Sequence, residues 1–279
     1  MTANTAILDT TETIPDPSPG DVAGHAKSCL RLLSFNIQAG VASTRPHHYL
    51  TRSWKHVLPH PSSFDNLDRI ARLTANYDLV AIQEADAGSM RSYFVNQVEY
   101  LARRGHFPFW CHQTNRDLGK FAQHSNGLLS KIRPHLIAQH KLPGLIPGRG
   151  AMMVQLGHGE ARLAVLLVHL ALGRRTRLRQ FDFISELIRD FKHAVVMGDF
   201  NCVPESHEMD LLLSKTHLCE PTAALHTFPS WRPYRNIDHI LVTRSLKISN
   251  LQVIHHALSD HLPIAVEIEV PEDVQLLGT

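Results

Sequence analysis

The feature that most constrains this chain is a short apolar segment that ends in two polar side chains, Val195–Asn201. Two valines and a methionine predict a buried strand, and Gly198, which has no Cβ, allows a sharp turn at its end. Asp199 and Asn201 are two residues apart, so extended backbone would place both side chains on one face. Such a pair can accept a proton from water and hold the water in place. An ordinary Asp–Asn turn is the alternative.

Length and composition indicate a globular protein with a sizeable core. The 279 residues suffice for one large domain or two small ones, and 43% of them are hydrophobic while 19% are charged. The net charge of +2, with His neutral, gives no overall electrostatic reason to bind nucleic acid. Any such binding must therefore come from a local basic patch.

The sequence predicts neither a disulfide framework nor stable membrane insertion. Its four cysteines form no C-x-x-C pair, and no apolar run approaches the length of a membrane span. Residues 1–28 are rich in Thr, Pro and Asp and lack the apolar core of a secretory signal, so we expect a disordered tail and a cytoplasmic location. We expect one domain over 29–271 and a second tail over 272–279.

Polar residues also occur at the ends of other predicted strands. The strand 77–84 ends in Glu84, and a carboxylate there is unfavourable unless it is paired or bound to a metal. The apolar strand before His169 ends in an imidazole that could equally be a hydrogen-bonded core residue. The strand ends in this set are Asn36, Glu84, His169, Asp199 with Asn201, and Asp260 with His261. Asp238, in the middle of the predicted strand 236–243, makes a sixth site. Oxygen ligands without Cys favour Mg²⁺ or Mn²⁺ over Zn²⁺.

Two basic segments are candidates for substrate contact. A predicted helix over 174–191 begins with Arg174, Arg175, Arg177 and Arg179. Positive charge at a helix N-terminus opposes the macrodipole, and a bound anion would relieve this, although a solvated charged face is the alternative. The long segment 39–63 mixes aromatic and basic residues and could be a substrate-contacting flap or a packed surface loop.

Six motifs, taken in order, resemble the endonuclease/exonuclease/phosphatase superfamily. The motifs are Asn36 at the first strand end, Ile-Gln-Glu84, Val-His169-Leu, Gly-Asp199-Phe-Asn201, Ile-Asp238-His and Ser-Asp260-His261-x-Pro. The superfamily includes pancreatic-type deoxyribonucleases, abasic-site endonucleases, neutral sphingomyelinases and inositol polyphosphate phosphatases. The resemblance covers about residues 30–270. It implies an α/β fold, a four-layered α/β sandwich of two packed mixed β-sheets flanked by helices, with the site at one end.

The resemblance also implies a metal centre and substrate contacts. Glu84 is expected to be the principal ligand of Mg²⁺, or alternatively of Mn²⁺, with Asn36 and Asp260 in the metal shell or holding its waters. Asn126 lies where relatives often have a polar site residue, and we expect it to contact the substrate. Apart from the resemblance, we also expect substrate contacts from Arg149 and from Arg174 at the start of the basic helix.

The remaining matched residues are expected to be catalytic. Asp199 would activate water, with Asn201 orienting it. His261 would bind or protonate a phosphate oxygen, oriented by Asp238, and His169 would be a second imidazole on the phosphate. Whether His261 or Asp199 is the base stays open.

These expectations predict a divalent-metal-dependent phosphodiesterase, most directly a nuclease acting on DNA or RNA. The alternative is a phospholipid or small-molecule phosphodiesterase or phosphatase, sphingomyelinase-like or inositol-phosphatase-like, although no amphipathic membrane helix is evident. A catalytically idle scaffold is a third hypothesis. It is disfavoured because every matched acidic, amide and imidazole position is filled.

Overall fold

The computed structural model describes residues 6–7, 28–41, 62–117, 119, 121–144, 148–158, 161–221 and 225–276. The expected tail over 1–28 lies almost entirely outside the described residues. So does most of the expected flap over 39–63.

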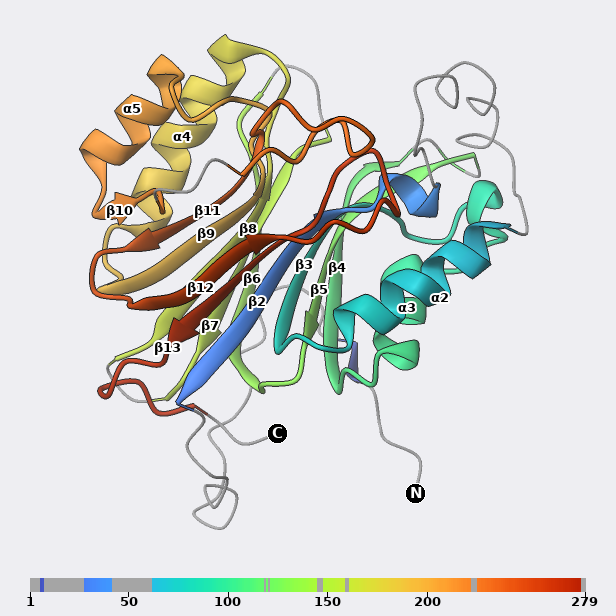
Figure 1. Ribbon diagram of the computed structural model, residues 1–279, viewed down its shortest axis with the longest axis horizontal. Helices are drawn as coiled ribbons and strands as arrows, with labels where there is room; N and C mark the ends of the chain where they lie inside the picture. Colours follow the sequence, from blue (N-terminus) through green and yellow to red (C-terminus); the bar gives the residue numbers. More distant parts are fainter. Residues whose placement is uncertain are drawn as a thin grey trace.

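Two mixed β-sheets pack face to face, and helices cover the outer face of each, as the superfamily resemblance predicted (Figure 1). The first sheet has the order β1-β4-β5-β3-β2-β13-β12 and the second the order β10-β11-β9-β8-β7-β6. The first contains β1 (Ala6–Ile7), β2 (Cys29–Asn36), β3 (Leu79–Asp86), β4 (Phe109–Asp117), β5 (Gln123–Ser130), β12 (Ile248–Val253) and β13 (Ile264–Glu269). The second contains β6 (Pro134–Lys141), β7 (Gly150–Leu156), β8 (Leu163–His169), β9 (His193–Asp199), β10 (Leu218–Cys219) and β11 (Asp238–Thr243).

Helices α2 (Ser62–Thr74) and α3 (Gln97–Arg104) cover the first sheet, and α4 (Arg174–Ile188) and α5 (His207–Lys215) cover the second (Figure 1). Two 3₁₀ turns, η1 (Gln38–Gly40) and η3 (Met90–Ser92), follow β2 and β3. Side chains cap two of these helices: Asn96 accepts from the backbone at the start of α3, and Ser206 does so at α5. Helix α4 begins at Gly173 without a side-chain cap.

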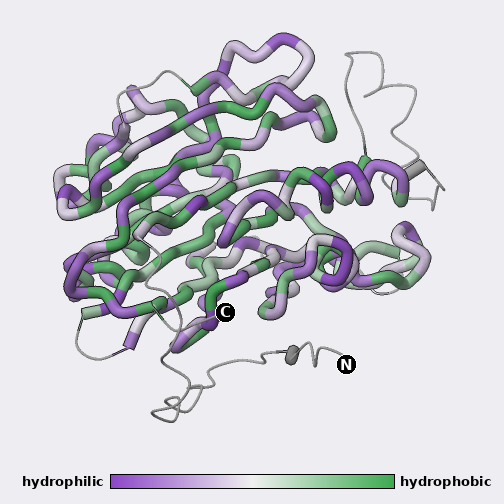
Figure 2. The backbone as a smooth tube through the Cα atoms, turned by 60° about the horizontal axis from the view of Figure 1, so that its bottom comes forward, coloured by the Kyte–Doolittle hydropathy of each residue, from purple (hydrophilic) through white to green (hydrophobic). Residues whose placement is uncertain are grey.

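Successive strand residues belong to different cores because their side chains point to opposite faces. In β9, Val195 and Met197 pack between the sheets, whereas Ala194 and Val196 pack against α4 and α5. Apolar positions run along the strands, and hydrophilic ones gather in the connections (Figure 2). Burying one such Val or Leu side chain stabilises the fold by roughly 1.5–3 kcal/mol, so this double burial fixes the register of the strands.

Strand direction determines which residues meet. Strands β2 and β3 run parallel, as do β8 and β9, while β11 and β13 run antiparallel to their neighbours β9 and β2. A hydrogen bond joins Asn36, at the end of β2, to Asp199, at the end of β9. The carboxyl ends of β2, β3, β8 and β9 and the starts of β11 and β13 therefore share one end of the sandwich, which we call the site end.

Several boundaries differ from the sequence-based expectation. The mostly polar sequence of 113–125 is typical of a loop, but β4 continues to Asp117 and β5 begins at Gln123, because the two strands pair with each other there. Strand β3 continues two residues beyond Glu84, to Asp86. Asp238 begins β11 instead of lying within a strand.

The segment expected as a C-terminal tail makes specific contacts over its described residues. Val274 is buried in the core between the sheets. Asp273 accepts hydrogen bonds from Lys192 and lies 3.0 Å from Nε2 of His193. Residues 273 and 274 are thus attached to the start of β9.

Two predictions from composition can be compared with the described chain. All four cysteines are free thiols. Among the described helices, none combines the length and apolar character needed to cross a bilayer.

Candidate active site

Asn36 connects the two sheets at the site end. Its Nδ2 donates to Oδ2 of Asp199 at 3.2 Å, and its Oδ1 accepts from the backbone N–H of Gln38 at 3.2 Å. Both Asn36 and Asp199 are buried. The ends of β2 and β9 are therefore held in fixed relative positions.

The Gly198–Asn201 segment is both a turn and a site element. Gly198 has φ of 149°, and a Cβ there would lie 1.9 Å from the carbonyl oxygen of Val168, so no other residue fits. Asn201, at φ 55°, donates its backbone N–H to Oδ1 of Asp199 at 2.9 Å. Its carboxamide donates to the carbonyl of Leu170 at 2.9 Å. The backbone of Asn201, more than its side chain, therefore orients Asp199.

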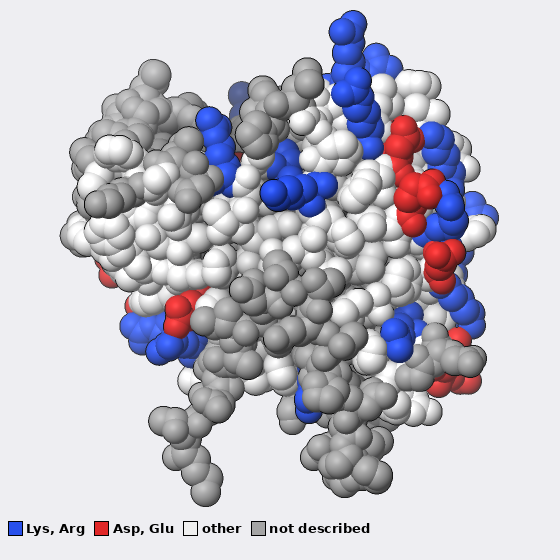
Figure 3. Space-filling model, turned by 180° about the vertical axis from the view of Figure 1, so that it is seen from behind, with Lys and Arg blue, Asp and Glu red and all other residues white. Residues whose placement is uncertain are grey.

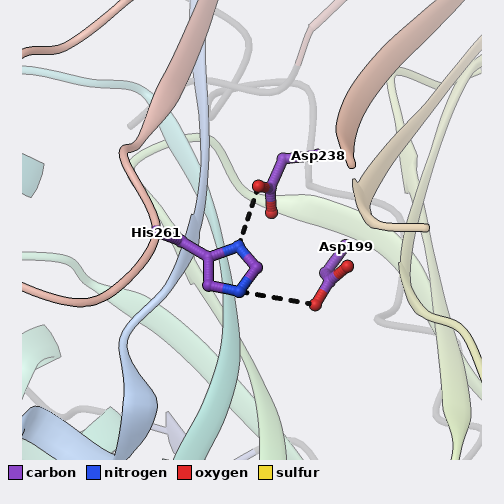
Figure 4. Close-up of side chains that lie close together, drawn as sticks. All are labelled: Asp199, Asp238 and His261. Carbon is purple, nitrogen blue, oxygen red and sulfur yellow. Dashed lines mark hydrogen bonds and ion pairs between the residues drawn. The ribbon is translucent and has the colours of Figure 1, made fainter. Parts of the chain in front are cut away.

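His261 lies between two carboxylates (Figure 4). Its Nδ1 is 2.8 Å from Oδ2 of Asp238, which also accepts the hydroxyl of Thr227 at 2.5 Å. Its Nε2 faces Oδ2 of Asp199 at 4.0 Å. Burial alone would lower the pKa of His261, but Asp238, Asp199 and Asp260 outweigh it and raise that pKa to about 10.

Glu84 occupies a bulge in β3. Ile82 pairs with Gly127 and Ala85 with Ser125, so two residues of β3 face the single Asn126 of β5. Glu84 itself has φ of 57°, the left-handed region that β-branched and bulky residues rarely adopt. Such strain commonly accompanies a functional position, and here it places a carboxylate where a regular strand would not.

Glu84 and Asp260 are neighbouring acids that repel each other. Desolvation is the first cause that raises the pKa of Glu84, although 34% of its side chain is exposed. The negative charge of Asp260 is the second cause that raises this pKa. The charges of His261 and Arg149 and a hydrogen bond from Asn36 lower it in part. A divalent cation bound by these oxygens would remove the repulsion, and hard oxygen donors suit such a cation.

A second group of side chains could also hold a cation. One donor atom each from Asp199, Asp238 and His261 lies within 4.8 Å of the others. Asp238, however, is already engaged by His261 and Thr227. The pair Glu84 and Asp260 is the better cation site, because the two carboxylates repel each other and Glu84 also lines the cavity described below.

His169 completes the buried cluster. Its Nε2 lies 3.5 Å from Oδ2 of Asp199 and 3.6 Å from Oε1 of Glu84, and it also contacts the guanidinium of Arg149. Burial, with the positive charge of Arg149 and His261, holds the pKa of His169 well below its ordinary value. The ring is therefore uncharged at neutral pH and can bind an oxygen without adding charge.

A cavity of about 530 Å³ opens beside this cluster. Its lining includes Glu84 and His169 of the cluster, the guanidinium-bearing Arg116 and Arg149, and Gly173 just before α4. Burial and the charge of Arg91 lower the pKa of His124, which also lines the cavity, to about 4. A separate hollow of about 820 Å³ lies over α4 and α5, away from these groups.

Two of the three predicted substrate-contacting residues line the cavity. Asn126 does so and donates Nδ2 to the carbonyl of Gly150 at 3.2 Å, and Arg149 does so as well. Arg174 is not among the lining residues; its Nε lies 3.3 Å from Oε2 of Glu208, and 61% of its side chain is exposed. Arg174 therefore pairs with helix α5 and does not line the cavity.

Two of the four arginines at the start of α4, Arg174 and Arg177, pair with Glu208 of α5. Arg177 is buried and donates to Oε1 of Glu208 at 2.6 Å and to the carbonyl of Ala171 at 3.0 Å. On the face seen in Figure 3, acidic and basic side chains alternate along one edge. No sequence pattern revealed Glu208 as their partner, because it lies 31 residues beyond Arg177.

Two functional neighbours were missed by the sequence analysis. Thr227, whose hydroxyl holds Asp238, precedes it by 11 residues in a segment without periodicity. The polar residues around His124 are typical of a loop, whereas His124 pairs in β5 opposite Asp86. Only the pairing of β3, β4 and β5 brings His124 to the cavity.

Comparison with solved structures identifies the same architecture in distant proteins. An endonuclease/exonuclease/phosphatase from Beutenbergia cavernae DSM 12333 is 18% identical, with a TM-score of 0.68 over 88% of this chain and 72% of that one. The mannosyl-6-phosphatase Bt3783 of Bacteroides thetaiotaomicron VPI-5482 is 17% identical, with a TM-score of 0.63 over 86% of this chain and 100% of that one. D. rerio TDP2, complexed with a single-strand DNA product, is 15% identical, with a TM-score of 0.63 over 88% and 100%.

At these identities the solved structures establish the fold alone. A comparison with curated proteins gave no match. The model of the Endonuclease/Exonuclease/phosphatase family matches residues 33–261, a range that includes all eleven predicted site residues and ends at His261. The chain therefore belongs to the endonuclease/exonuclease/phosphatase family.

Proposed function

We propose that this protein is a divalent-metal-dependent hydrolase of phosphoester bonds and that its substrate is a nucleic acid. The observation that carries the proposal is the gathering of Glu84, Asp260 and Asp199 with the His261–Asp238 pair at one buried end of the sandwich. Buried carboxylates that repel each other are unfavourable unless a cation or substrate uses them. Membership of a family of phosphoesterases supports the same chemistry.

Glu84 and Asp260 would hold the cation, with Mg²⁺ or Mn²⁺ suited to their oxygen donors, and Asn36 beside them. The bound cation would supply Lewis-acid polarisation of a phosphate oxygen and neutralise developing charge. Asn36 also fixes Asp199 through its hydrogen bond.

Asp199 is the proposed base. Burial raises its pKa to about 7, against the opposing charge of His261, so it can take a proton from water near neutral pH. His261 faces the same space, and its raised pKa favours an imidazolium that binds a phosphate oxygen or donates a proton. Asp238 holds that ring in place through Nδ1.

His169 and Arg149 would stabilise the additional negative charge of the phosphate in the transition state. Both line the cavity next to Glu84. Preorganised donors of this kind are typically the largest single contribution to such catalysis.

Two observations bear on the substrate. D. rerio TDP2 was solved with a single-strand DNA product, and two arginines, Arg116 and Arg149, line the cavity of this protein, which supports nucleic acid. Arg174 and Arg177 pair with Glu208, so these two arginines do not support nucleic acid as the substrate. The compact cavity favours a second candidate, a small phosphoester, and one structural neighbour is a mannosyl-6-phosphatase.

The proposal is tested by hydrolysis assays with Mg²⁺, Mn²⁺ or EDTA on single-stranded DNA, RNA, a hexose 6-phosphate, a phospholipid and bis(4-nitrophenyl) phosphate. We expect metal-dependent cleavage that falls about 10²–10⁴-fold in Asp199→Ala, as for loss of a general base. Asp182→Ala is the matched control, because Asp182 is exposed and paired with Lys215. Full activity in Asp199→Ala, or equal activity in EDTA, contradicts the proposal.

A further inference from the structure

The exposed large hydrophobic side chains of the described chain are confined to the site end. They are Tyr93, Phe94, Phe121, Leu172 and Tyr234. These residues lie in the connections after β3, between β4 and β5, after β8 and before β11, all of which leave the sheets at the site end. Scattered exposed apolar residues need no explanation, but a group confined to one end indicates a contact surface.

One of these connections, residues 228–235, combines aromatic and basic side chains, and we call it the arm. Its sequence is Phe-Pro-Ser-Trp-Arg-Pro-Tyr-Arg. Tyr234 is 65% exposed, and Arg232 and Arg235 are exposed as well. The ring centroid of Phe228 lies 4.9 Å from that of His261, and the guanidinium of Arg235 lies over the same phenyl ring at 6.0 Å. The arm therefore contacts a proposed catalytic residue through Phe228 and leaves Tyr234 and both arginines accessible to solvent.

The arm is fixed to the site by its backbone. Phe228 and Arg235 exchange N–H···O bonds of 3.1 and 3.0 Å, which close it as a hairpin. Ser230 donates its N–H to the carbonyl of Asp260 at 2.7 Å and its hydroxyl to the carbonyl of Ser259 at 2.6 Å. A preorganised element of this kind loses little conformational freedom when it binds a ligand.

The chemistry of the arm matches one strand of nucleic acid. An exposed tyrosine ring can stack on a base only when a face of that base is accessible, as in a single strand. Neighbouring guanidinium groups can contact the phosphates on either side, and such contacts carry no requirement for sequence. We propose that the arm binds a single-stranded nucleic acid and leads it to the phosphate site beside His261. This inference rests on the proposed function and adds the strand type and the residues that bind it.

Binding to the full-length protein tests the inference without requiring turnover. Fluorescence anisotropy of a labelled twelve-nucleotide DNA strand is measured in EDTA. Tyr234→Ala should weaken binding about 10-fold, because stacking contributes roughly 1–3 kcal/mol per base, whereas Tyr234→Phe should bind like wild type. Arg235→Ala should lower the slope of log K against log salt by about 0.7, the value for one phosphate contact on a single strand.

Arg244→Ala is the matched control, because Arg244 is exposed and follows β11 at the opposite end of the sandwich. It should leave affinity and salt slope unchanged. Melting temperatures of all variants, compared with wild type, establish that each one is folded. Duplex DNA of the same sequence should bind more weakly than the single strand and respond less to Tyr234→Ala.

Three results of the anisotropy measurements overturn the inference: no binding of the strand by wild type, wild-type affinity in both Tyr234→Ala and Arg235→Ala, or equal sensitivity of duplex and single strand to Tyr234→Ala. Co-sedimentation with anionic phospholipid vesicles that depends on Tyr234 would assign the arm to a lipid surface instead, and so also overturns it. The proposed function is judged separately by bis(4-nitrophenyl) phosphate, which is too small to need the arm. If wild type with Mg²⁺ or Mn²⁺ does not hydrolyse this compound, the proposed hydrolase function is refuted. The anisotropy measurements still decide whether the arm binds a single strand.

Discussion

Two acids on the same strand, Glu84 and Asp86, differ sharply in their surroundings. Asp86 is fully buried and accepts hydrogen bonds from the backbone of Gly88 and Ser89 and the hydroxyls of Ser89 and Ser92. It also forms an ion pair with Arg91. Burial would raise the pKa of Asp86, but these partners lower it to about 2. The pKa of Glu84, in contrast, is raised by desolvation and by Asp260.

The difference teaches how to separate structural from functional carboxylates. The loop 87–92 folds back over Asp86 and supplies nearly every donor that its two oxygens can use. Glu84 is left facing a cavity and another acid. A buried acid with satisfied partners stabilises the fold, whereas one with repelling neighbours is available for a cation or substrate.

The largest expected effect comes from removing the satisfied acid. Asp86→Asn should lower the free energy of unfolding by about 3–5 kcal/mol, because the buried Arg91 loses its carboxylate. Urea denaturation measures this. Asp68→Asn is the control, since Asp68 pairs with Arg104 at the surface and such pairs contribute about 1 kcal/mol or less. Equal losses of unfolding free energy in Asp86→Asn and Asp68→Asn would contradict the structural role given to the buried Asp86.

Removing the carboxylate of Glu84, which lines the cavity, should instead affect activity and metal binding. Glu84→Gln should lower kcat/KM about 100-fold or more, because Lewis-acid stabilisation amounts to several kcal/mol. Saturating Mg²⁺ or Mn²⁺ should stabilise wild type by about 2.7 kcal/mol at 100 times Kd. Thermal unfolding should show this gain in wild type and in folded Asp86→Asn, but not in Glu84→Gln. A metal-induced gain in Glu84→Gln would place the cation elsewhere, such as at Asp199 and Asp238.

The pH dependence of stability sharpens the same contrast. The pKa of Asp86 is about 2 in the folded protein, below its ordinary value of 3.8. Its ionised carboxylate therefore contributes fully to the stability of the fold at any pH above that ordinary value. This contribution should be lost as pH falls from about 4 to 2, and it amounts to on the order of 2 kcal/mol. Urea denaturation across this range should show the difference between wild type and Asp86→Asn becoming smaller. A difference that stays constant to pH 2 would contradict the low pKa.

The smallest effect is expected at Arg174. Because Arg174 pairs with Glu208 and is not among the residues that line the cavity, Arg174→Ala should lower kcat/KM less than about 3-fold, a change below 1 kcal/mol. Arg149→Ala, which removes a cavity-lining cation, is the comparison and should lower kcat/KM more. A larger loss in Arg174→Ala would restore the sequence-based expectation that it contacts the substrate.

The sequence predicted the parts of the site that local pattern can encode. Apolar runs ending in Glu84, His169 and Asp199 marked strand ends, and the structure gathers these residues at one end of the sandwich. Their catalytic roles remain proposals. The sequence did not predict the bulge that places Glu84, because a register shift is decided by the partner strand β5. Nor did it separate Arg174 from the substrate-contacting residues, because Glu208 comes from another helix.

The sequence by itself determined the alternation of apolar side chains, the turn at Gly198 and the polar residues that follow each strand. These are local properties, set by strand periodicity and by the space available to a side chain. Only the tertiary structure decided which polar groups become neighbours. It surrounded Asp86 with donors, set Glu84 beside Asp260, and attached the arm at 228–235 to His261. The pKa of each group follows from neighbours that are distant in the chain, so no local pattern could determine it.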